Sequence, residues 1–199
     1  SFNNIGLIYY FKGNYRIINC TFSKEEKLKV ALDRIRSLAE IAAREGIKQI
    51  ILTDKIIDEN TLAIPMVLAV GAVNSHLIQK SLRGFISLNV QTGDVLDTHS
   101  YATLLGVGAT TINPYLALDT ICQRFEKNLF GKFDIEDCIK RYIKSVDNGL
   151  LKIMSKMGIS VLSSYRGGCN FETVGLSRAI VAEYFPGVTS RISGIGLTG

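Results

Sequence analysis

Short apolar runs alternate along this chain with longer stretches whose apolar residues recur every three or four positions. A short run rich in β-branched residues predicts a buried strand, and the longer spacing predicts a helix. Because parallel strands need a crossover connection, usually a helix, this alternation constrains the fold more than any other feature. It predicts the α/β class, with a mainly parallel sheet built from successive β-α units and helices on both faces. The predicted strands are residues 16–22, 48–53, 85–90, 109–112 and 159–162.

Residue types that favour helix ends mark the boundaries of the predicted helices. Ser23 and Glu26 form the pattern of a capping box before the first helix, and Gly46 supplies a stop after it. Pro65 suits the first position of a second helix, and Asp134 is the expected cap of the longest one. The predicted helices are residues 28–42, 65–79, 98–105, 114–127, 135–157 and 176–184, and residues 186–199 are predicted to be irregular.

Length and composition place the chain among globular proteins with one sizeable core. It has 199 residues, of which 47% are hydrophobic and only three are proline. No apolar run reaches the roughly 18 to 20 uncharged residues of a membrane-spanning helix, and the first residues lack a signal-peptide pattern. These features predict a soluble, cytoplasmic protein without a membrane partner. We expect an irregular N-terminal segment at residues 1–15 and a single α/β domain at residues 16–199.

The charge pattern argues against a nucleic-acid partner. The net charge is +5, but its lysines and arginines alternate with acids, as in residues 24–27. Nucleic-acid binding surfaces usually gather basic residues on one face or in one run. We therefore expect no nucleic acid among the partners.

The cysteines do not have the spacing of a metal site. Cys20, Cys122, Cys138 and Cys169 are well separated, whereas zinc and iron-sulfur ligands usually come in closely spaced pairs. The sequence predicts buried free thiols and no metal on this chain.

Neither histidine nor the glycine-rich end carries a specific motif. His76 and His99 are predicted to be partly buried residues that form hydrogen bonds, and a general base made by His99 with Asp97 is the alternative. Residues 194–199 match G-x-G-x-x-G, but that pattern binds dinucleotides only between a strand and the helix that follows. We expect no catalytic residue in either place.

Polar residues follow several predicted strands. The carboxyl ends of parallel strands gather at one edge of a sheet, where ligands usually bind. Asp54, Asp94 and Asn113 lie at such ends and are candidate positions of a site.

The loop after the predicted strand at 159–162 is the most suggestive segment. Two hydroxyls, an arginine and two glycines can hold an anion through backbone amides and a guanidinium. The alternative is a tight turn whose arginine pairs with a carboxylate of this or a neighbouring domain. The candidate residues are Ser163, Ser164, Tyr165, Arg166, Gly167 and Gly168.

Three segments together, residues 64–78, 106–117 and 149–160, resemble the central domain of the glutamate synthase large subunit. The third continues through residues 164–167, and residues 190–197 are similar too. The resemblance covers most of the chain from about residue 22. Asn74 and Ser75, Ser100, residues 168–170 and residues 188–189 depart from the family pattern, which argues against a histidine cluster.

The resemblance implies a part of an enzyme that makes two glutamates from glutamine, 2-oxoglutarate and a reductant. In that family an amidotransferase domain releases ammonia, a flavin domain uses it, and the central domain connects the two. It implies FMN, an iron-sulfur cluster and NADPH or reduced ferredoxin in the parent enzyme, with no cofactor on this chain. The implied partners are the amidotransferase and flavin domains of the same polypeptide.

Two questions stay open. Because the chain starts with Ser1 in place of the catalytic cysteine, we expect an inactive piece of a longer polypeptide, with a separate subunit as the alternative. The alternative functions are a stand-alone α/β protein that binds an anion or acts as an enzyme through residues 163–168, and a partner-binding module.

Overall fold

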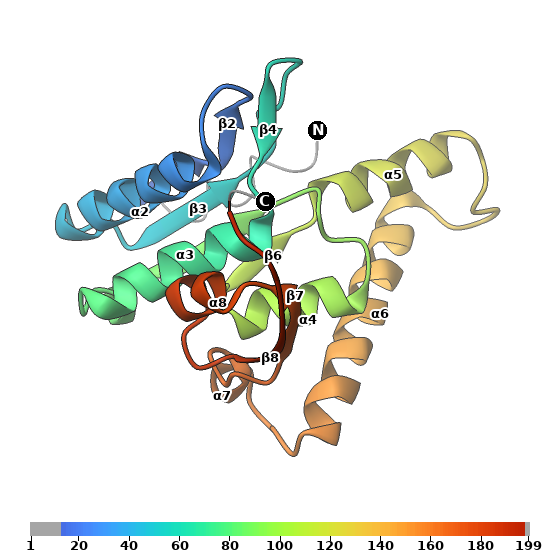
Figure 1. The fold of residues 1–199 in the computed structure, drawn as a ribbon. Coiled ribbons are helices and arrows are strands. Elements are labelled where there is room, and N and C mark those ends of the chain that lie inside the picture. Colours follow the sequence, from blue (N-terminus) through green and yellow to red (C-terminus); the bar gives the residue numbers. More distant parts are fainter. Residues whose placement is uncertain (1–12, 198–199) are drawn as a thin grey trace.

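A four-stranded parallel sheet forms the centre of the computed structural model, which describes residues 13–197 (Figure 1). Its strands are β1 (Tyr15–Asn19), β3 (Gln49–Thr53), β5 (Ser87–Gln91) and β6 (Thr111–Asn113), in the order β1-β3-β5-β6. Every neighbouring pair is parallel. The α/β class and the mainly parallel sheet are confirmed. Residues 1–12 of the predicted N-terminal segment lie outside the described residues, as do residues 198–199.

Three helices connect these strands: α2 (Leu28–Arg44), α3 (Met66–Gln79) and α4 (Thr98–Gly106). The strand order advances in one direction only, so right-handed crossovers place all three helices on the same face of the sheet. Figure 1 shows α2 and α3 running side by side in front of β3, and α4 packs on α3. The connecting helices therefore cover only one face of the sheet, whereas helices on both faces were predicted.

The main core lies between this helical layer and the sheet. Successive strand residues point to opposite faces, and Ile18, Leu52 and Val90 share the face that meets the helices. Ile35 of α2 and Val70 of α3 are fully buried against them. Burying each such side chain contributes roughly 1.5–3 kcal/mol.

The opposite face of the sheet carries a row of polar side chains. The Asn89 amide donates to Gln49 Oε1 at 3.0 Å, and the Thr111 hydroxyl donates to Asn89 Oδ1 at 2.7 Å. Asn89 is only 3% exposed, so these bonds satisfy groups that water does not reach. The two faces of this sheet are thus chemically different. The apolar runs that predicted the strands do not indicate this difference.

Two small sheets flank the main one. β2 (Thr21–Ser23) pairs antiparallel with β4 (Thr61–Ala63), and β7 (Glu172–Leu176) pairs parallel with β8 (Thr189–Ile195). The prediction of an irregular tail at 186–199 is wrong at β8. Its partner β7 belongs to a different segment, so no local pattern marks the pairing.

Two predicted strands need correction. Residues 16–22 form two strands, because the N–H of Cys20 bonds to Thr53 while its carbonyl accepts from Ile64, which moves the chain from β3 to β4. No strand forms at 159–162. There the N–H of Ile159 turns back to Met154 at 2.9 Å and closes the preceding helix.

The remaining helices complete the fold. Asp134 caps the longest one as predicted, since its side chain accepts the N–H of Asp137. The predicted capping box is wrong, because Ser23 ends β2 and the first helix begins only after Lys27. The remaining elements are α5 (Tyr115–Glu126), α6 (Ile135–Lys156), α7 (Leu162–Tyr165), α8 (Arg178–Tyr184) and the 3-10 helix η1 (Arg83–Phe85).

Candidate functional site

Polar groups do converge at the carboxyl edge of the main sheet. Asp54 follows β3 and is only 2% exposed. Its carboxylate accepts the hydroxyl of Thr92 and, at 3.2 Å, the backbone N–H of Gly93, both in the loop after β5. The backbone N–H of Thr92 in turn donates to the carbonyl of Asn113 at 3.0 Å. The carboxyl ends of three adjacent strands are thereby joined.

The second carboxylate of this edge caps a helix. Asp94 Oδ2 accepts the N–H of Met66 at 3.0 Å, at the start of α3. A carboxylate at this position satisfies a free amide and interacts favourably with the helix dipole. The hydroxyl of Thr92 accepts the N–H of Asp94 at 3.0 Å. The structure therefore brings Asp54, Asp94 and Asn113 to one edge, as the sequence indicated, and engages them in hydrogen bonds within the fold.

Burial determines the acidity of this cluster. Desolvation raises the pKa of Asp54, while hydrogen bonds from Thr92 and Gly93 act against that rise; the nearby Asp94 raises the pKa and the Tyr115 hydroxyl lowers it. Burial and then the charge of Asp54 raise the pKa of Tyr115 to about 12. Tyr115 was not singled out from the sequence, although its position directly after a strand end was the available signal. The arrangement holds loops together and leaves no open pair of carboxylates for acid-base work.

The predicted anion-binding loop does not converge on one point. Its first half is the short helix α7, in which Ser163 and Ser164 are exposed and the ring of Tyr165 is buried edge-on against Phe171. The N–H of Gly167 donates to the carbonyl of Gly106 at 2.9 Å. This bond fastens the loop to the end of α4 and uses one of the amides that were expected to hold an anion. Gly168 is likewise engaged, because its N–H donates to the carbonyl of Tyr165 at 3.2 Å.

The arginine of this loop lies near a second arginine, close enough for their charges to interact. Arg166 is half-buried, and its Nε has no hydrogen-bond partner within residues 13–197. Arg83 of η1 is near enough for the charge of Arg166 to lower its pKa, after the larger effect of burial. Arg83 was missed from the sequence, because nothing near it in the chain indicates that it meets Arg166.

A mostly apolar cavity of about 350 Å³ lies between α3, α4, α8 and β7. The rings of His99 and Phe171 contribute to its wall, with their centroids 6.2 Å apart. Asp97 does not act on His99 through a hydrogen bond among the described residues. Its carboxylate caps α4 by accepting the N–H and hydroxyl of Ser100 at 2.8 and 2.6 Å. The geometry gives no support to a general base at His99.

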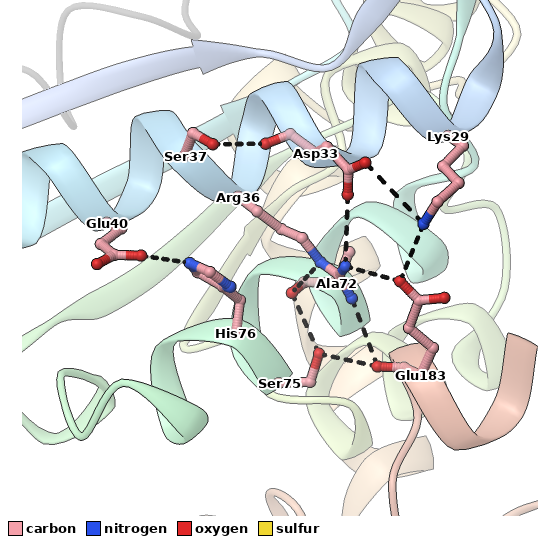
Figure 2. Close-up of polar contacts among 9 residues, drawn as sticks. All are labelled: Lys29, Asp33, Arg36, Ser37, Glu40, Ala72, Ser75, His76 and Glu183. Atoms are coloured by element: carbon pink, nitrogen blue, oxygen red, sulfur yellow. Dashed lines mark hydrogen bonds and ion pairs between the residues drawn. The ribbon is translucent and has the colours of Figure 1, made fainter.

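His76 forms the hydrogen bond that was predicted for it. Its Nε2 lies 2.6 Å from Glu40 Oε2, so that it joins α3 to α2 (Figure 2). Bonds from Arg44 and then from His76 hold the pKa of Glu40 below its usual value. This contact is structural, because both side chains lie between packed helices.

The cysteines do not form a binding site. Cys20 and Cys138 are buried, Cys122 is half-buried and Cys169 is exposed. Within the described part of the chain, no group of three His, Cys, Asp or Glu side chains can hold a metal ion. These cysteines therefore do not fit an iron-sulfur cluster. Among residues 13–197, no helix is both long and apolar enough to cross a membrane.

The fold and these contacts define an α/β domain whose polar strand ends serve its own structure. The family model of the glutamate synthase central domain matches residues 3–177, and the chain belongs to that family. It is 56% identical over 185 residues to the large chain of the NADPH glutamate synthase of Azospirillum brasilense. The match covers 92% of this chain and 12% of that protein.

Further relatives match a similar share of the chain, and one of them is named for a different electron donor. The chain is 42% identical over 174 residues to the NADPH enzyme's large chain from Bacillus subtilis, covering 86% of this chain and 11% of that protein. It is also 42% identical over 185 residues to the chloroplastic ferredoxin-dependent enzyme of Spinacia oleracea, covering 87% and 11%. The chain thus spans only about a tenth of the length of these relatives.

Proposed function

We propose that this chain is the connecting domain of a glutamate synthase and holds its amidotransferase and flavin domains in place. The observation that carries the proposal is coverage: the relative at 56% identity matches 92% of this chain, yet that match is 12% of its own length. A segment of this kind is one module among several in a long polypeptide. The carboxylates engaged at the strand ends fit a structural role.

The role does not depend on the electron donor. Relatives named for NADPH, NADH and ferredoxin all match most of the chain. A domain shared by enzymes with different reductants performs a task common to all of them. We propose that FMN, the iron-sulfur cluster and the reductant bind elsewhere in the polypeptide. A cytoplasmic location remains a prediction from composition.

Exposed apolar side chains on the segments that carry the strand-end cluster support contact with a flanking domain. Ile56 and Ile57, after β3, are 63% and 54% exposed, and Leu96, after β5, is 71% exposed. Leu116 is 47% exposed and lies against Gly93 in the same cluster. Apolar patches of this kind usually mark contact with another protein surface. We propose that a flanking domain of the same polypeptide covers this edge.

The test uses the complete native polypeptide. Leu96→Glu places a charge in the proposed contact, and Leu129→Glu alters a leucine of similar exposure, 64%, in the loop after α5. Glutamate formation is measured with glutamine and, separately, with added ammonia as nitrogen source. We expect Leu96→Glu to lower the glutamine-dependent rate several-fold relative to the ammonia-dependent rate, and Leu129→Glu to leave the ratio unchanged. Equal ratios in both variants, or a native polypeptide only as long as this chain, would contradict the proposal.

The alternative of a stand-alone anion-binding or catalytic protein is not favoured. The family match runs through residues 3–177, and the loop at 163–168 does not close into a cradle. Hydrolysis of glutamine by the purified chain alone would support this alternative.

A further inference from the structure

The amino edge of the sheet, opposite the strand-end cluster, holds two arginines on adjoining segments. Arg83 precedes β5 and donates to Asn74 Oδ1 at 2.6 Å, to the carbonyl of Ile86 at 2.5 Å and to that of Gly108 at 2.7 Å. Arg166 comes from the loop after α7. The N–H of Gly167 in that loop donates to the carbonyl of Gly106. Gly106 is two residues before Gly108, whose carbonyl accepts from Arg83. These bonds bring three segments far apart in the sequence together, and Arg166 lies near enough for its charge to act on Arg83.

The positive charge of this pair is not compensated within residues 13–197. Neither Arg83 nor Arg166 takes part in an ion pair there, whereas all three arginines of α2 do. The three bonds of Arg83 go to an amide oxygen and two carbonyls, which carry no net charge. Burial and the charge of Arg166 both lower the pKa of Arg83. Like charges held together in a half-buried place destabilise the fold unless an anion joins them.

Arg83 is also positioned rigidly, as a binding group needs to be. Its three bonds fix the plane of the guanidinium, and an arginine has five N–H donors, so two remain. Arg166 makes no side-chain hydrogen bond within the described part of the chain, and its buried Nε has no partner. Guanidinium N–H groups bind carboxylate and phosphate oxygens, often two at a time, and both arginines have N–H groups left for such an oxyanion.

We propose that Arg83 and Arg166 form a binding site for one oxyanion, a carboxylate or phosphate group. The group belongs either to a small molecule or to an acidic side chain from outside residues 13–197. This site differs from the predicted cradle of hydroxyls and glycines, because only Arg166 of that loop takes part. The inference does not depend on the proposed function, since the two arginines need an anion whichever enzyme contains them.

The experiment measures backbone hydrogen-deuterium exchange in the complete native polypeptide, which reports locally on residues 83–86, 106–110 and 166–168. The variant is Arg166→Gln, and Arg166→Lys is made in case the first variant does not fold. Arg124→Gln is the matched control, because Arg124 is exposed near the end of α5, which packs chiefly on α6. Inorganic phosphate is the free-anion probe, exchanged for chloride at constant ionic strength.

For a small-molecule site, phosphate at about twice its Kd slows exchange about threefold in the native protein and not in Arg166→Gln. For an acidic side chain, phosphate has no effect, and Arg166→Gln speeds exchange at these segments while Arg124→Gln does not. Arg166→Lys gives a smaller effect of the same sign, because it keeps the charge and loses the paired geometry. Exchange that is unchanged or slower in Arg166→Gln, with no response to phosphate in the native protein, would overturn the proposal.

Discussion

Arg36 of α2 and Glu183 of α8 form an ion pair in which Nη1 and Oε1 are 2.9 Å apart (Figure 2). The Arg36 side chain is only 13% exposed, and its guanidinium also lies 4.4 Å from the ring centroid of Tyr184. Nε and Nη2 donate to the carbonyls of Ala72 and Glu183 at 3.3 and 3.4 Å. One arginine therefore joins α2, α3 and α8. The helix α8 in turn contacts both C-terminal strands, β7 and β8.

Glu183→Gln is expected to lower the free energy of unfolding by about 1 kcal/mol. The change removes the negative charge beside a mostly buried guanidinium, and Glu183 is itself 41% exposed, which limits the effect. Lys140→Gln is the control, because its pair with Glu136 is 71% and 68% exposed and contributes roughly 0.3 kcal/mol. Urea unfolding of both variants measures the difference. Equal losses would mean that Arg36 does not depend on this partner.

The same pair gives the stability a defined pH dependence. Burial raises the pKa of Glu183, but hydrogen bonds from Arg36 and Lys29 outweigh it and hold the pKa below its usual 4.5. The folded state therefore binds this proton less readily than the unfolded state, so its contribution is complete above pH 4.5 and is lost as the pH falls through the folded pKa. We expect Glu183→Gln to reduce the slope of unfolding free energy against pH below 4.5. An unchanged slope in urea titrations at several pH values would refute this.

Thr92→Val is expected to cost about 2 kcal/mol at the strand-end cluster. The buried hydroxyl donates to Asp54 and accepts from the N–H of Asp94, so valine keeps the shape and removes both bonds, one of them from the buried carboxylate of Asp54. Thr120→Val, at an exposed threonine of α5, is expected to change stability by less than about 0.5 kcal/mol. The midpoints of urea unfolding of the two variants measure this difference in stability. A neutral Thr92→Val would show that the cluster is held without this hydroxyl.

Gly71→Ala is expected to destabilise the domain by about 1–2 kcal/mol, even though alanine favours helices. An added Cβ would lie 2.4 Å from the ring of Phe185 and 2.8 Å from the carbonyl of Tyr184, where α8 packs on α3. Gly84→Ala meets nothing within 4 Å and should be close to neutral. Thermal unfolding of the two variants decides, and a stabilised Gly71→Ala would mean that α8 can move away at little cost.

The sequence predicted those parts of the fold that local patterns encode. The helix α2 follows from its apolar spacing and from Gly46, whose φ of +82° is the left-handed stop expected there. The strand β3 follows from its apolar run. Asp54 and Asp94 were found because parallel strands end at one edge of a sheet, a rule that needs only the order of elements.

Other predictions failed where a distant partner determines the structure. Residues 159–162 are apolar enough for a strand but have no strand beside them, and the chain at residues 189–195 pairs with β7 although it was predicted to be irregular. A strand depends on hydrogen bonds to another segment, whereas a helix satisfies its own backbone. Local patterns therefore predict helices better than short edge strands.

By itself, the sequence determined the α/β class, the principal helices, the strand-end positions and the resemblance to the glutamate synthase central domain. Only the tertiary structure showed that Arg83 lies near enough to Arg166 for their charges to interact, that Arg36 joins three helices, and that the strand-end carboxylates bond within the fold. Such pairs depend on where separate segments pack. How these segments pack is set by the burial of the apolar surface of the whole domain. The residues next to either partner in the sequence therefore do not indicate the pair.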